Sequence, residues 1–244
     1  MRTAPPAYPP HDPPKSRAWP SSFEATVWQS YLSGLKRHWG GALYRQVVMA
    51  AESCGADSVE TLEAAMRDDP GYRLYAWLER RIQQMKWSGR WGFSTLVGEN
   101  REWLASLLDE ASSSSFLRLD PELQVPEYVT GTETHQQPGG LWRDPVNAYA
   151  LAWYTTGLSF ALSRPDDLVD FYAARMVERC EEIGLSPASI LDLGCTSGRS
   201  TRAIKRALPQ ADVYGCDISE GALRLGALRT SEEGLPVRSE EHTS

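Results

Sequence analysis

The stretch ILDLGCTSGR, residues 190–199, is an apolar run followed by a tight glycine turn and the start of a helix. Helical spacing continues through residues 199–208, Pro209 ends it, and residues 211–216 form a second apolar run of strand type. This order predicts one β-α-β unit with parallel strands. The glycine turn then lies at the carboxyl edge of the sheet, where open α/β sheets bind ligands.

The residue types in and after this turn indicate a ligand that carries a ribose. Gly194 and Gly198 let a ligand approach the backbone closely, because a side chain there would occupy the ligand's volume. The helix that follows points free N–H groups into the turn. Asp217 ends the second strand, and a carboxylate at that place can accept both hydroxyls of a ribose.

The other end of the ligand is indicated by Asp192 and Thr196. A dinucleotide-binding turn has the pattern G-x-G-x-x-G, and Thr196 stands where its second glycine is needed. Asp192 precedes the turn, where a carboxylate repels a pyrophosphate and attracts an ammonium group. The expected ligand has a ribose at one end and an ammonium group at the other, which is the shape of S-adenosylmethionine. A nicotinamide-dependent enzyme is kept as a distant alternative.

The segments ILDLGCTSGRS and ADVYGCDISEGALRLGALR together resemble the Rossmann-like, class I S-adenosylmethionine-dependent methyltransferases. The resemblance implies that the first segment holds the methionine end of the cofactor, that the acid after the second strand holds the ribose, and that the next residue lies against adenine. Thr196 departs from the glycine that the family often has there. The expected cofactor-binding residues are Asp192, Gly194, Cys195, Thr196, Gly198, Asp217 and Ile218.

The resemblance also implies a reaction, in-line transfer of a methyl group to a small-molecule acceptor. Family members often place an aromatic side chain of the preceding helix against the methionine moiety, which makes Tyr149, Trp153 and Tyr154 candidates for a lid. Packing in an ordinary helical core is the alternative for each of the three. No catalytic base is identified, since His38 and His135 both fit ordinary structural or surface roles.

The expected fold class is α/β: an N-terminal helical region followed by the first β-α-β-α part of a Rossmann-like sheet, which is incomplete. All nine tryptophans lie between Trp19 and Trp153, a shift in composition that indicates more than one structural unit. The predicted layout is a disordered proline-rich tail (1–20), a tryptophan-rich helical region (21–111), a loop-rich connector (112–142), helices that precede the sheet (143–186), a partial cofactor-binding domain (187–237) and an artefactual tail (238–244).

The tryptophan-rich region supplies a second hypothesis about function. Its apolar residues recur at helical spacing and are interrupted at Gly40-Gly41, at Gly55, at residues 69–71 and at residues 89–92, which predicts several short helices. Ser58 is a plausible N-cap residue. Residues 72–91 mix arginines with tyrosines and tryptophans, so this region could instead be a non-catalytic module that binds a partner.

Composition limits the remaining possibilities. A formal net charge of −7 argues against nucleic acid as a partner, because nucleic-acid binding needs a basic face. No apolar run is long enough to span a membrane and no segment resembles a signal peptide, so we expect no membrane partner and a cytoplasmic protein. The four cysteines lack the pair spacings of metal sites, so no metal is expected. The sequence does not determine the oligomeric state.

The last seven residues, RSEEHTS (238–244), have no apolar alternation. They match the in-frame translation of a common short-read sequencing adapter, so we expect an artefactual tail and a natural protein that continues beyond Val237. The first strands alone would leave a sheet short of partners. The chain as written is therefore expected to show little or no transfer activity.

Overall fold

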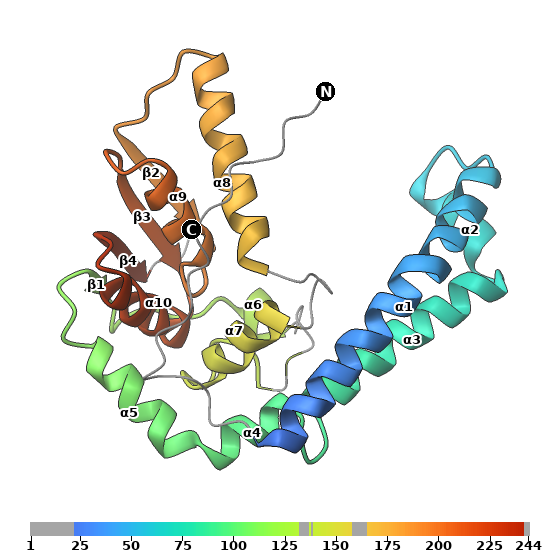
Figure 1. Ribbon diagram of the computed structural model, residues 1–244, viewed down its shortest axis with the longest axis horizontal. Coiled ribbons are helices and arrows are strands. Elements are labelled where there is room, and N and C mark those ends of the chain that lie inside the picture. The colour runs from blue at the N-terminus through green and yellow to red at the C-terminus, as the bar shows by residue number, and fades with distance from the viewer. Residues whose placement is uncertain (1–21, 132–136, 138, 158–164, 242–244) are drawn as a thin grey trace. The chain divides into compact units, whose positions relative to one another are not determined.

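The structure is a computed structural model that describes residues 22–131, 137, 139–157 and 165–241 (Figure 1). The chain forms two compact units, which we call the hairpin unit and the sheet unit. The described residues 22–96 make up the hairpin unit, and those of 97–156 and 165–241 make up the sheet unit. In the described part of the chain, none of the helices is both long and apolar enough to cross a bilayer.

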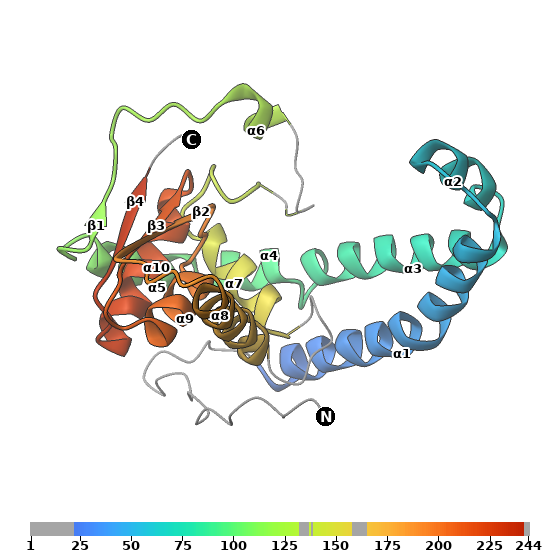
Figure 2. The same ribbon diagram turned by 90° about the horizontal axis from the view of Figure 1, so that it is seen from above.

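The hairpin unit consists of two long helices that lie side by side, α1 (Phe23–Ser53) and α3 (Pro70–Trp87), joined through α2 (Val59–Met66) (Figures 1 and 2). Side-chain oxygens cap all three helices: Ser22 caps α1, Asp69 caps α3, and Ser58 forms a capping box with Thr61 at α2, which confirms Ser58 as an N-cap. The large buried side chains include Leu32, Trp39, Ile82 and Trp87.

The predicted helix break at Gly40-Gly41 is wrong, because α1 runs through both glycines for 31 residues. A glycine inside a helix costs about 1 kcal/mol relative to alanine but leaves the backbone hydrogen bonds intact. Burial of Leu32, Trp39 and Val47 along α1, which packs on α3, outweighs that cost. The expected interruption near Gly55 is confirmed, since α1 ends just before it and Gly55 has a φ of +67°.

The sheet unit contains four parallel strands in the order β1-β4-β3-β2. Helix α9 (Arg199–Ala207) joins β2 (Ser189–Leu193) to β3 (Asp212–Asp217), and α10 (Glu220–Glu233) joins β3 to β4 (Val237–Glu241). The remaining strand, β1 (Leu117–Arg118), comes from the predicted connector. These strands and helices confirm the predicted β-α-β unit and the α/β class.

Helices cover one face of this sheet. Both α9 and α10 pack on β3 and β4, where Val213 and Val237 are buried. Helix α8 (Pro165–Glu182) packs on α9, and α5 (Arg101–Ala111) packs on α10. On the other face, Leu191 and Leu193 of β2 are 59% and 62% exposed. The other helices are α4 (Phe93–Glu99), α6 (Glu127–Gly131) and α7 (Asn147–Gly157).

The hairpin unit ends at residue 96 of the sequence, and α5, which the predicted layout includes in the helical region, packs on α10 and belongs to the sheet unit. Strand β4 extends to Glu241 and so includes residues 238–241 of the predicted tail. Strand pairing uses backbone groups that almost any residue provides, so the artefactual origin of those residues stays a prediction. The predicted tail of residues 1–20 lies outside the described residues.

Candidate functional site

The glycine turn between β2 and α9 is built from backbone conformations with positive φ. Gly194, Thr196 and Gly198 have φ values of +71°, +49° and +64°. The N–H groups of Gly194 and Cys195 both donate to the carbonyl oxygen of Cys216, at 2.8 and 3.0 Å. This pair of bonds anchors the turn to the end of β3.

Gly194 leaves open space at the mouth of the turn. A Cβ atom added there would have no atom outside its chain neighbours within 4 Å, and the residue is exposed. The positive φ already favours glycine, and the open space above it is where a ligand could approach the backbone. The turn therefore fits the close approach that the sequence predicted.

Thr196 connects the turn to the acid that ends β3. Its backbone N–H donates to Oδ2 of Asp217 at 2.8 Å, across 21 residues of sequence. A β-branched residue in the left-handed region is unusual and strained, which explains why glycine suits this position. The hydrogen bond brings the two halves of the predicted site together.

Asp217 is a half-buried carboxylate with acceptor capacity to spare. Oδ2 accepts from Thr196, and Oδ1 accepts from the backbone N–H of Ser219 at 2.9 Å. The backbone N–H of Ile218 also interacts with this carboxylate, and since a carboxylate has about four lone-pair sites, acceptor capacity remains for a ribose. Burial raises the pKa of Asp217, while the N–H groups of Ser219 and Thr196 oppose that shift. Ile218, half-buried, follows directly.

Asp192 has a structural role that sequence reasoning missed. Its Oδ2 accepts hydrogen bonds from Ser200 Oγ at 2.8 Å and from Thr201 Oγ1 at 2.6 Å. These bonds tie the end of β2 to the first turn of α9. The paired hydroxyls directly after the glycine turn are the signal in the sequence that could have indicated this role.

Cys195 lies in the turn and faces inward. It is 3% exposed, and burial, with the nearby carboxylates of Asp217 and Asp192, raises the pKa of its thiol. A neutral, buried thiol is a poor nucleophile. A Cβ atom at Gly215 of β3 would lie 2.9 Å from the Cys195 sulfur, so glycine is needed at position 215 for β3 to pack against Cys195.

Arg202 also supports the turn and was not predicted. It is 5% exposed, and its Nη1 donates to the carbonyl oxygen of Ser197 at 2.8 Å. Its Nε donates to Oε1 of Glu233, at the end of α10, also at 2.8 Å. The sequence does not show that Arg202 lies on the buried side of α9, because this depends on how the helix packs.

Of the remaining predicted residues, Tyr149 and His38 have described side chains. Tyr149 is 5% exposed in α7, which fits packing in a helical core. The side chains of Trp153 and Tyr154 lie outside the described residues, as does His135. His38 is exposed on α1, in the hairpin unit.

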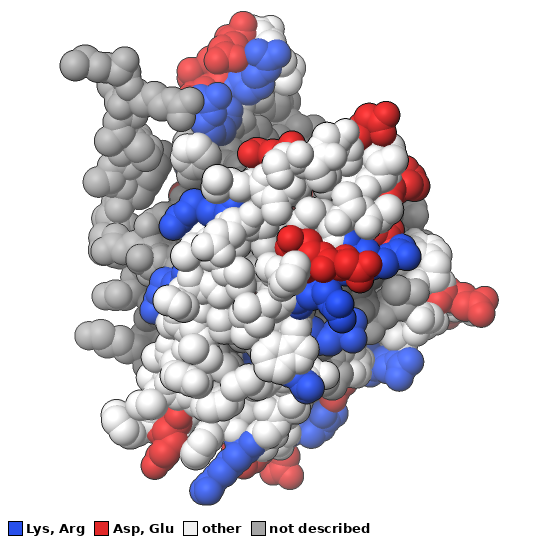
Figure 3. Space-filling view, turned by 90° about the vertical axis from the view of Figure 1, so that its right-hand side faces the viewer, with Lys and Arg blue, Asp and Glu red and all other residues white. Residues whose placement is uncertain are grey.

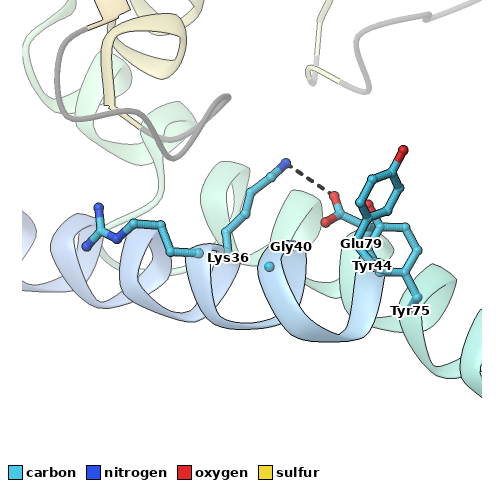
Figure 4. A pocket seen from close by; sticks show the side chains of 7 residues that line it. Lys36, Gly40, Tyr44, Tyr75 and Glu79 are labelled. Carbon is cyan, nitrogen blue, oxygen red and sulfur yellow. Dashed lines mark hydrogen bonds and ion pairs between the residues drawn. The ribbon is translucent and has the colours of Figure 1, made fainter. Parts of the chain in front are cut away.

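The hairpin unit has a shallow hollow of its own, with a volume of about 400 Å³. Lys36 of α1 reaches toward Glu79 of α3 at 3.2 Å, and the rings of Tyr44 and Tyr75 lie together with centroids 5.6 Å apart (Figure 4). Glu79 also accepts from the indole nitrogen of Trp39 at 2.9 Å. The Glu79 carboxylate in this hollow is therefore paired with a cation and an indole N–H.

The face drawn in Figure 3 carries both signs of charge. Lysine and arginine side chains are interspersed with carboxylates and separated by uncharged surface, and they form no continuous cationic stripe on that face (Figure 3). Nucleic-acid binding normally uses such a stripe. The absence of a nucleic-acid partner stays a prediction.

Residues 190–243 match a family model described as "Methyltransferase domain". The match supports a methyltransferase of Rossmann-like fold, that is, a transferase that methylates its substrate. The matched residues include every predicted cofactor-binding residue, from Asp192 to Ile218. No curated protein matches the chain.

Proposed function

We propose that this methyltransferase uses S-adenosylmethionine and acts on a small molecule. One observation carries the proposal: the 2.8 Å hydrogen bond from the Thr196 N–H to Asp217. It joins a turn that is open to a ligand to an acid that retains acceptor capacity for a ribose. A ligand with a ribose at one end and an amino-acid group at the other fits this combination of an acid and an open turn.

The proposal assigns residues to both the adenosine end and the methionine end of the cofactor. Asp217 accepts the ribose hydroxyls, and Ile218 lies against the adenine ring. Gly194 and Gly198 allow the methionine portion to approach the backbone, beside Cys195 and Thr196. Asp192 uses Oδ2 for α9, so Oδ1 is the atom proposed to face the ammonium group. When bound, the cofactor supplies an electrophilic methyl group on its sulfonium.

The protein's contribution to the transfer is positioning. An acceptor atom held in line with the sulfonium methyl needs little further assistance when it is already nucleophilic. A base is required only when the acceptor must lose a proton first. Among the described residues the site presents no histidine, and Cys195 is buried as a thiol. We therefore propose an acceptor that is nucleophilic without deprotonation by residues of this turn.

The test is a calorimetric titration with S-adenosylmethionine and S-adenosylhomocysteine. We expect binding by the unsubstituted chain and a loss of about tenfold to a hundredfold in affinity for Asp217→Ala, because the ribose loses its hydrogen bonding to a charged acceptor. Asp212→Ala is the matched control, since Asp212 is an exposed aspartate at the opposite end of β3. Equal losses in both variants, or binding of NAD instead, would contradict the proposal.

We further propose that the natural protein continues beyond Val237 and that this chain alone transfers no methyl group at a measurable rate. The exposure of Leu191 and Leu193 on the uncovered sheet face supports this, because large apolar side chains normally pack against further structure. Resequencing of the locus tests it. A genomic reading frame that encodes RSEEHTS and then stops would refute the continuation, and robust turnover by this chain would refute its inactivity.

A second function is supported by the surface of the hairpin unit. Tyr31 and Trp77 are each 53% exposed there, and exposed aromatics of this size are enriched in protein interfaces. This observation favours a binding module without catalysis. The same titration distinguishes the two functions, because a module of this kind binds neither cofactor.

A further inference from the structure

Ser219 is the junction between the candidate site and a distant part of the chain. Its backbone N–H holds Oδ1 of Asp217 at 2.9 Å, and its Oγ accepts from Ala222 N at 3.3 Å as the N-cap of α10. The same Oγ donates to the carbonyl oxygen of Leu141 at 2.7 Å, 78 residues earlier. Ser219 is 2% exposed, so these bonds form away from solvent.

The segment that receives this bond, residues 140–146, is attached at several other points, and we call it the strap. The strap residue Asp144 pairs with Arg101 of α5, with Nη2 and Oδ1 3.1 Å apart. The carbonyl oxygen of Gly140 accepts from Asn147 Nδ2 at 2.9 Å. The strap therefore has a defined position next to the start of α10.

Gly221 shows how closely the strap approaches α10. A Cβ atom at this position would lie 2.6 Å from the carbonyl carbon of Pro145, closer than real Cβ contacts allow. Only glycine lets the two backbones meet at this distance. Gly221 and Ser219 thus hold the strap against the first turn of α10, two to four residues after Asp217.

We propose that the strap forms a wall of the adenosine part of the cofactor site and that Ser219 is a positioning residue for Asp217. This inference rests on the proposed function. Because Ser219 binds the strap through its side chain and the acid through its backbone, displacement of the strap moves the group that orients the carboxylate. Ile218, proposed to lie against adenine, lies between Asp217 and Ser219 in the sequence.

Two substitutions loosen the strap without changing a proposed cofactor-binding residue. Ser219→Gly removes the bond to Leu141, and glycine is a tolerated N-cap residue, so the start of α10 is retained. Gly221→Ala places a methyl group against Pro145. We expect each variant to bind adenosine and S-adenosylhomocysteine about tenfold more weakly, which corresponds to about 1.4 kcal/mol.

The matched control is Ser22→Gly, which removes the N-cap of α1 and leaves the strap in place. It should bind both ligands as the unsubstituted chain does. Hydrogen exchange on the unsubstituted chain provides a measurement that needs no variant: S-adenosylhomocysteine should slow exchange of the amides in residues 140–146.

The outcomes separate the two proposals. Binding by the unsubstituted chain with unchanged affinity in both strap variants, or with unchanged exchange in the strap, overturns the role of the strap and leaves the proposed function standing. Absence of binding by the unsubstituted chain overturns the proposed function, and this inference with it.

Discussion

Two glycines in a long helix of the hairpin unit and two glycines around the turn of the sheet unit have different surroundings. A Cβ atom at Gly40 or Gly41 of α1 would have no neighbour within 4 Å. At Gly215 it would lie 2.9 Å from the Cys195 sulfur, and at Gly226 3.2 Å from the backbone of Ser197. The sheet unit around the turn depends on close backbone approach. The paired helices α1 and α3 of the hairpin unit depend instead on apolar side chains between them, and Gly40 and Gly41 have no packing role there.

Burial also displaces the pKa of a charged group in each unit, Lys86 in the hairpin unit and Asp217 in the sheet unit. Lys86 of α3 is 2% exposed, and burial, with repulsion from Lys36, lowers its pKa to about 6 against a weaker opposing effect of Glu79. Asp217 has its pKa raised, mainly by burial. The two shifts disfavour charge in both units but act in different pH ranges.

The largest expected effect is therefore a pH dependence confined to the hairpin unit. Between its folded pKa of about 6 and its unfolded value of 10.5, Lys86 binds more protons in the unfolded state, so stability rises with pH. The expected gain is about 1.4 kcal/mol for each pH unit in this range. Native-state hydrogen exchange of α3 amides, corrected for intrinsic rates, should show it between pH 7 and pH 9.

The sheet unit provides the contrast. Because the pKa of Asp217 is raised, the folded state binds more protons than the unfolded state between about pH 4 and the folded pKa. The contribution of Asp217 to stability therefore falls as pH rises through this range and is constant above it.

The pH dependence of the hairpin unit is tested with two variants of α3. Lys86→Met should abolish the pH dependence of α3, and Arg81→Met, which removes an exposed cation from the same helix, should retain it. Equal protection of α3 at pH 7 and pH 9 in the unsubstituted chain would contradict this interpretation.

The next largest effect comes from replacing glycines in the two units. Gly40→Ala with Gly41→Ala should stabilise the hairpin unit by about 2 kcal/mol in total, because alanine is the better helix former and nothing obstructs its methyl group. Gly215→Ala should destabilise the sheet unit by about 1 to 3 kcal/mol through overpacking against Cys195. Urea unfolding followed by hydrogen exchange assigns each change to its unit. A change in stability of the same sign in both units would contradict the distinction drawn between their glycines.

The features that sequence alone predicted are those with local signals. The β-α-β unit follows from two apolar runs and a helical spacing, and the N-cap at Ser58 follows from residue types three positions apart. The full length of α1 could not be predicted, because packing on α3 decides whether Gly40-Gly41 interrupts a helix.

The candidate site divides in the same way. Asp217 could be placed because a carboxylate directly follows a strand, at the carboxyl edge of the sheet. The roles of Asp192, Arg202 and Ser219 depend on which groups the fold brings within hydrogen-bond distance. Those partners lie on other helices and loops, or come within reach only because of the conformation of the turn. Spacing in the sequence therefore does not identify them.

The smallest effect is expected at Thr196, where the turn itself departs from glycine. A β-branched residue at a φ of +49° stores about 1 to 2 kcal/mol of backbone strain. Glycine relieves that strain but loses about 0.5 to 1 kcal/mol to the entropy of the unfolded chain. Thr196→Gly should therefore stabilise the sheet unit by about 1 kcal/mol or less, measured by urea unfolding.

Thr196→Ala separates the strain from the side chain. Alanine removes the branched β carbon but still disfavours a positive φ, so it should fall between threonine and glycine. Affinity for S-adenosylhomocysteine should be unchanged in both variants, because the bond to Asp217 comes from the backbone N–H. If glycine instead lowers stability or affinity, the threonine side chain contributes to the turn, and close backbone approach alone does not define this half of the site.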